Sequence, residues 1–173
     1  ALFEIADVYL PRPGEGLPDQ PNRLALVAGL DFAGLKGVIE ALLGRLHAAE
    51  GLEVRPADVP MFSGGRSAEL LLAGEHLGYL GEVDRARLDA MELREACAAA
   101  ELEMAVLRAR AVLVPCYHAL PPFPAVERDL SLVVEQALPW AELAGTVAAT
   151  AGPTLEAVDY LDTFRGGNLP DGR

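Results

Sequence analysis

The sequence predicts an α+β protein built from two units. Apolar and polar residues alternate in several short segments, which is typical of strands with one buried face. Residues 35–46 instead repeat apolar side chains at helical spacing. Three prolines within residues 117–124 favour an extended connection, so we expect a domain boundary there.

Composition indicates a folded chain and excludes some classes of protein. Of its 173 residues, 51% are hydrophobic and 23% are charged, close to globular averages. No apolar run approaches the roughly 18 residues that cross a bilayer, which excludes an integral membrane protein. The net charge of −12 disfavours nonspecific attraction to nucleic acid or anionic lipid, so any nucleic-acid contact must be local. Two cysteines and the lack of a secretion signal predict a cytoplasmic location.

The first unit should begin with strands that flank a helix. Residues 2–10 alternate with a period near two and predict a strand. Residues 11–22 contain four prolines and predict an exposed loop. Short strands are expected at residues 24–28 and 52–54, before and after the helix of residues 35–46.

A β-hairpin is predicted next. Residues 67–73 and 76–83 flank Gly74 and Glu75, a pair suited to a tight turn. Asp84 follows and can cap a helix that runs through residue 92, because its carboxylate can accept from free amides of the first turn. Residues 101–107 then alternate like a strand, although their Ala, Glu and Leu also suit a helix.

The second unit should have the order strand, helix, strand. Strands are predicted over residues 128–134 and 154–164. Between them, Pro139 suits the first position of a helix over residues 140–151, which the following Gly-Pro pair ends. A lone βαβ unit leaves sheet edges and one helix face uncovered, so this unit looks unfinished.

Few residues carry recognisable chemistry. Cys116 and His118 could in principle form an activated thiolate, but sequence neighbours rarely have that geometry. The three histidines lack the spacing of zinc ligands, so no metal site is expected. Residues 63–67 could offer backbone amides to a phosphate, although a turn before the hairpin is favoured. The residues alone therefore indicate no active site.

Several segments resemble the β subunit of bacterial phenylalanyl-tRNA synthetases. Residues 123–134 read FPAVERDLSLVV and are similar to FPAVRRDLALVV, the opening of that family's anticodon-binding domain. Residues 160–172 read YLDTFRGGNLPDG and resemble LFDVYRGEGIPEGK. Four upstream segments also resemble motifs of the family. Residues 2–5 resemble LFEIG, residues 32–41 resemble FFDLKGVVEA, residues 65–69 resemble GRSAEI, and residues 77–82 resemble IGYLGEL. The matches are in the family's order and cover nearly the whole chain.

The resemblance implies the domain organisation. Residues 1–115 would be the C-terminal part of the β subunit's catalytic-like domain, a class II synthetase-like fold with an antiparallel sheet and no working catalytic residues. Residues 116–124 would be a linker, and residues 125–173 would begin a ferredoxin-like anticodon-binding domain whose later half follows residue 173. The family's editing site and metal-linked helical module would precede residue 1.

The resemblance also implies a function. The whole enzyme would be a cytoplasmic α2β2 heterotetramer that attaches phenylalanine to tRNA(Phe) with ATP and Mg²⁺, through an adenylate made on the α subunit. The present piece would bind no cofactor or metal, contact the α subunit and begin the anticodon-binding domain. The alternatives are a freestanding ferredoxin-like regulatory module and a small Cys/His hydrolase.

Three residues would contact the anticodon by this resemblance. Asp162 and Phe164 lie two apart on a predicted strand and so share a side. The carboxylate could accept from guanine while the ring stacks on a splayed base. Ala125 is small and would leave room beside them. The family has Tyr at the position of Phe164, so Phe164 retains the aromatic ring but lacks the hydroxyl. Alternation alone would equally allow Phe164 to be a core residue.

Overall fold

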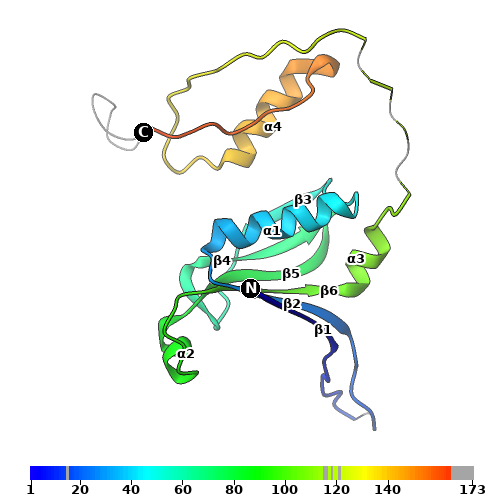
Figure 1. The fold of residues 1–173 in the computed structure, drawn as a ribbon, viewed down its shortest axis with the longest axis vertical. Helices are drawn as coiled ribbons and strands as arrows, with labels where there is room; N and C mark the ends of the chain where they lie inside the picture. Colours follow the sequence, from blue (N-terminus) through cyan, green and yellow to red (C-terminus); the bar gives the residue numbers. More distant parts are fainter. Residues whose placement is uncertain (15, 115–116, 118, 121, 165–173) are drawn as a thin grey trace. The chain divides into compact units, whose positions relative to one another are not determined.

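A computed structural model describes residues 1–14, 16–114, 117, 119–120 and 122–164 (Figure 1). The chain divides into two compact units, Ala1–His118 and Ala119–Arg173. Within the described residues, no helix is both long enough and apolar enough to cross a membrane.

The first unit is built on a six-stranded antiparallel sheet. Its strand order is β1-β2-β6-β5-β4-β3, so the last strand in sequence lies between β2 and β5. The strands are β1 (Leu2–Asp7), β2 (Asn22–Ala28), β3 (Leu52–Pro56), β4 (Phe62–Leu72), β5 (Glu75–Val83) and β6 (Ala98–Glu103). This architecture confirms the predicted α+β class.

Helices α1 (Phe32–Arg45) and α3 (Met104–Arg110) pack on the sheet, and α2 (Arg85–Ala90) follows β5 (Figure 1). Helix α1 buries Leu35, Ile39 and Leu43, which recur at helical spacing. They meet the side chains of β2, β4, β5 and β6 that point to the same side of the sheet. Each fully buried leucine contributes about 1.5–3 kcal/mol of transfer free energy, so this layer is the principal source of stability.

The start of α1 is held by two carboxylates. Asp31 caps the helix, and its Oδ1 accepts a hydrogen bond of 2.8 Å from the Gly34 amide. Glu82 on β5 accepts a second bond, of 3.2 Å, from the Phe32 amide. Its other oxygen accepts a bond of 2.6 Å from Arg66 on β4. The bonds to Arg66 and Phe32 lower the pKa of Glu82, and the bond from Glu82 raises the pKa of Arg66.

Glu82→Gln is expected to lower the free energy of unfolding by about 1 kcal/mol at pH 7. The folded-state pKa of Glu82 is lowered, so its contribution is complete above the unfolded-state pKa of about 4.3 and is lost as pH falls through the folded-state pKa. The difference in urea unfolding between the wild type and the variant should therefore shrink as pH falls below about 4.3. A difference that persists unchanged at pH 3, or an equal effect of Glu50→Gln at an exposed site, would contradict this role.

The predicted hairpin is confirmed, but its turn is shifted by one residue. The register pairs Leu72 with Glu75, which leaves Ala73 and Gly74 as the turn instead of Gly74 and Glu75. Both have positive φ angles, 52° and 79°. A two-residue hairpin turn of this kind matches the twist of its strands, and glycine supplies that conformation readily.

The segment predicted as a strand over residues 101–107 is divided between two elements. Strand β6 ends at Glu103, and α3 begins at Met104, so the prediction of a continuous strand was wrong. Val106 and Leu107 turn into the core from this helix. The burial of Val106 and Leu107 therefore favours a helix over the strand that the alternating residues predict.

Other expectations for the first unit hold, with shifted ends. The strands predicted near residues 2–10, 24–28 and 52–54 are β1, β2 and β3, although β1 ends at Asp7. Beyond it, Leu10 and Asp19 exchange two backbone hydrogen bonds of 2.8 Å, so the predicted loop continues the β1–β2 ladder outward. Asp84 caps α2 as predicted, but α2 ends at Ala90 and not at residue 92.

The second unit contains α4 (Trp140–Ala151), as predicted, and the 3-10 turn η1 (Gly152–Thr154). Pro139 is the N-cap of α4 and not its first helical residue. The strands predicted over residues 128–134 and 154–164 do not form in the described residues, so both predictions were wrong. A strand requires a neighbour for its backbone groups, and no such pairing joins these two segments.

Candidate functional site

The three residues predicted to contact the anticodon lie in the irregular parts of the second unit. Asp162 and Phe164 follow η1, and Ala125 precedes α4. All three are exposed, and 73% of Phe164 is open to solvent. Among the described residues, no hydrogen bond, ion pair or ring contact joins them to one another. Phe164 is thus not buried in a core here.

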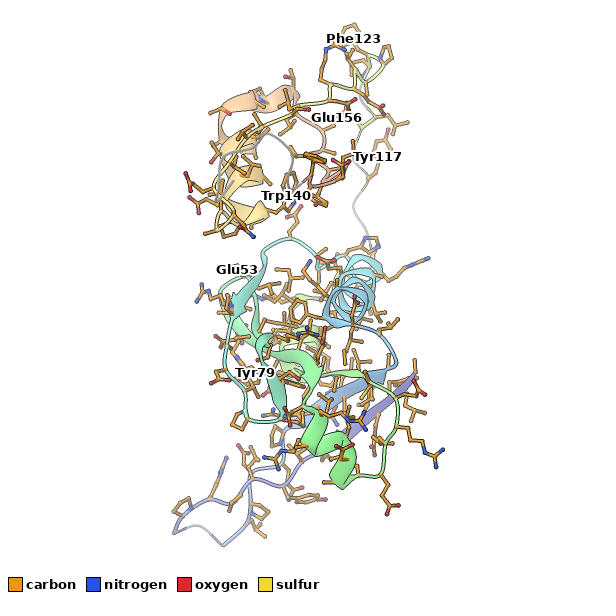
Figure 2. The ribbon with its side chains drawn as sticks, turned by 90° about the vertical axis from the view of Figure 1, so that its left-hand side faces the viewer. Glu53, Tyr79, Tyr117, Phe123, Trp140 and Glu156 are labelled. Carbon is orange, nitrogen blue, oxygen red and sulfur yellow. The ribbon has the colours of Figure 1, made fainter. Side chains whose placement is uncertain are left out.

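Trp140 and Tyr160 lie in the same unit and were missed by the sequence analysis. Trp140 begins α4 (Figure 2), and its ring meets that of Tyr160 with centroids 5.5 Å apart and planes inclined by 69°. The Tyr160 hydroxyl lies 2.6 Å from Oγ1 of Thr163. The two aromatic residues are twenty positions apart, so spacing could not have revealed their contact.

Exposed aromatic side chains are a general feature of this unit. All of its described residues are exposed or half-buried. Its aromatic residues within the described ranges are all exposed by 41–80%: Phe123, Trp140, Tyr160 and Phe164. Aromatic rings that are open to solvent can stack on the flat faces of unpaired bases.

The charge of the segment limits how it can meet RNA. Residues 155–164 include Glu156, Asp159 and Asp162 and contain no Lys or Arg. Such a segment repels phosphates, which supply most of the electrostatic attraction in nucleic-acid binding. Contact with RNA here would therefore rest on base stacking and on hydrogen bonds to base edges.

The outward side of α1 is a second candidate surface. Small or apolar side chains recur there at helical spacing, and Val38 is 45% exposed. The exposed members are Ala33, Gly37, Val38 and Ala41. Lys36 and Glu40 form an ion pair on the same helix. A narrow surface of small residues allows close approach by another helix.

Other motifs considered from the sequence carry no site. Cys116 and His118 lie outside the described residues. Residues 63–67 belong to β4 and do not form the expected turn. Gly65 has φ 73°, and the register between β4 and β5 shifts there, so the segment is an irregularity within a strand. Within the described ranges, no group of three possible metal ligands occurs.

Comparison with known proteins gives two family matches in one chain. Residues 1–104 match the phenylalanyl tRNA synthetase beta chain CLM domain, and residues 121–173 match the ferredoxin-fold anticodon binding domain. The second match supports a ferredoxin-like assignment of a unit whose described residues show only the helical part.

Curated relatives cover the chain almost completely. The phenylalanine–tRNA ligase beta subunit of Rhodopirellula baltica is 40% identical over 95% of this chain and 26% of the relative. Those of Clostridium tetani and Moorella thermoacetica are 34% and 35% identical over 99% of the chain, and over 22% and 23% of the relatives. The chain thus spans about a quarter of their length. Because the first family model alone covers more than half of it, the chain belongs to the phenylalanyl-tRNA synthetase beta chain family.

Proposed function

We propose that this chain serves a phenylalanine–tRNA ligase, an enzyme that uses ATP and Mg²⁺ to attach phenylalanine to tRNA(Phe) in the cytoplasm. The observation that carries the proposal is the occurrence of the CLM and anticodon-binding families, in that order, in one chain. The alternative of a freestanding module unrelated to translation is wrong, because both matched families belong to this ligase or to anticodon recognition.

The first unit would act as a scaffold of class II synthetase-like fold and perform no chemistry. Its six-stranded antiparallel sheet with helices on the core side supports that fold. On the opposite side of the sheet, Arg23 is bound by Glu101 at 2.6 Å and by Glu103 at 2.7 Å. An arginine that is engaged by two carboxylates is poorly suited to hold a nucleoside triphosphate. These contacts suit a structural role in which Arg23 joins β2 to β6.

The scaffold would bind the α subunit of an α2β2 heterotetramer through the outward side of α1. Val38 is exposed there among small residues, so a partner helix could approach closely. Charged residues are depleted at the buried centre of subunit interfaces, and the four exposed residues of this surface are uncharged.

Coexpression with the α subunit of a related enzyme tests this scaffold. We expect the chain to copurify with the α subunit and Val38→Glu to abolish copurification, because a buried carboxylate without a partner is strongly unfavourable. Val112→Glu is a matched control, since both valines are 45% exposed. Phenylalanine-dependent pyrophosphate exchange should be absent from the chain alone. Exchange by the purified chain, or equal retention of the α subunit by the Val38→Glu variant, would overturn the scaffold role.

The second unit would take part in anticodon recognition through Asp162, Phe164 and Ala125. Exposure of Phe164 supports stacking on a base, and the carboxylate of Asp162 can accept from the amino group of guanine. These interactions do not require a basic surface, which fits the acidic segment in which the residues lie.

A further inference from the structure

Tyr160 occupies a defined position beside the proposed anticodon contacts. Its ring meets Trp140, with centroids 5.5 Å apart and planes inclined by 69°. Its hydroxyl lies 2.6 Å from Oγ1 of Thr163, and either hydroxyl can be the donor. These two contacts restrain the ring, while 55% of the residue stays exposed. The side chain is therefore both oriented and accessible.

We propose that Tyr160 is a second base-stacking residue, which holds a nucleotide neighbouring the one that Phe164 contacts. The inference rests on the proposed function of the second unit. Tyr160, Asp162 and Phe164 lie within five residues of one exposed segment that follows η1. Four residues of chain can span up to about 13 Å, which is enough to separate two bases that are splayed from different nucleotides.

The contacts of Tyr160 suit a stacking platform. The bond to Thr163 holds the phenol hydroxyl within the segment that contains Asp162 and Phe164. Trp140 supports the ring through an edge contact, a favoured arrangement of aromatic pairs. A restrained ring loses little conformational entropy when a base stacks on it.

The acidic surroundings indicate that the ligand contact is with a base and not with a phosphate. Glu156, Asp159 and Asp162 lie in the same ten residues, and the nearest basic residue in the sequence is Arg165, five positions after Tyr160. Base stacking is tolerant of this charge because it needs no neutralised phosphate. Binding at Tyr160 should therefore depend only weakly on salt concentration.

The test measures binding of the 173-residue chain to a fluorescently labelled RNA hairpin with the anticodon stem and loop of tRNA(Phe). Tyr160→Leu should raise the dissociation constant about tenfold, as expected for loss of one base stack. Tyr160→Phe retains the ring and should remain within about twofold of wild type. Leu161→Ala is the neighbouring control, because Leu161 is 83% exposed and carries no aromatic ring.

Trp140 is the only tryptophan of the chain and supplies an internal readout. Added hairpin should change its emission in the wild type and in Tyr160→Phe, but much less in Tyr160→Leu. Raising the salt from about 50 to 200 mM should weaken binding less than tenfold, whereas several phosphate contacts would give a loss of 10³ or more.

The outcomes separate this inference from the proposed function. If Phe164→Leu weakens binding and Tyr160→Leu does not, the proposed function stands and the inference about Tyr160 is wrong. A Tyr160→Leu variant that lowers thermal stability without changing the dissociation constant likewise assigns Tyr160 to packing alone. If the wild-type chain does not bind the hairpin, both are overturned.

Discussion

Gly78→Ala is expected to destabilise the first unit by about 3–5 kcal/mol, at the upper end of single substitutions. Gly78 lies in β5 at φ 154°, a conformation that side-chain-bearing residues rarely adopt. A Cβ atom there would lie 1.9 Å from the carbonyl oxygen of Glu101 on β6 and 2.9 Å from its carbon. Both atoms belong to the backbone of a central strand, so no side-chain rotation can relieve the clash.

Chemical denaturation followed by circular dichroism measures this effect. Gly64→Ala is the matched control, because Gly64 also lies in a strand and a Cβ there would meet nothing within 4 Å. We expect the control to differ from wild type by less than about 1 kcal/mol. A Gly78→Ala variant as stable as the control would contradict the close approach of β5 and β6.

The order of elements in the first unit could be predicted because local patterns and tertiary packing agree there. The helical spacing of Leu35, Ile39 and Leu43 was visible in the sequence, and all three are buried against the sheet. Asp84 was identified as a cap from its residue type alone and bonds the Ala86 amide at 2.9 Å.

Local patterns failed where pairing or burial decided the structure. The turn at Ala73 and Gly74 depends on the register between β4 and β5, which residue types did not specify. The helix that begins at Met104 depends on burial of Val106 and Leu107. In the second unit, the alternating residues 128–134 and 154–164 have the composition of strands, but their backbone groups find no strand partner in the described residues.

In the candidate site, too, some features could be predicted from the sequence and others depend on tertiary contacts. The resemblance to the family predicts Asp162 and Phe164 as contact residues, and both lie on an exposed segment. The ring contact of Trp140 with Tyr160 joins residues that are distant in sequence, so no local sequence pattern could predict it.

Phe164→Ala in a complete heterotetramer is expected to raise the KM for tRNA(Phe) tenfold or more. The exposed ring would lose its stack on an anticodon base, an interaction worth about 1–3 kcal/mol. The substitution is remote from amino-acid activation if that step occurs on the α subunit, so adenylate formation should not change. Phe164→Tyr retains the ring and should remain near wild type in its KM for tRNA.

Leu161→Ala provides the matched control, since Leu161 is 83% exposed and lies in the same segment. It should leave the KM for tRNA within about twofold of wild type, because it removes no stacking ring. Thermal unfolding of all three variants separates loss of recognition from loss of folding.

The most direct test of the account compares two rates in one preparation of Phe164→Ala enzyme: aminoacylation as tRNA concentration varies, and pyrophosphate exchange without tRNA. We predict a raised KM for tRNA together with wild-type exchange and wild-type thermal stability. An unchanged KM together with a lowered melting temperature would contradict the account, because it would show that Phe164 stabilises the second unit and does not contact tRNA.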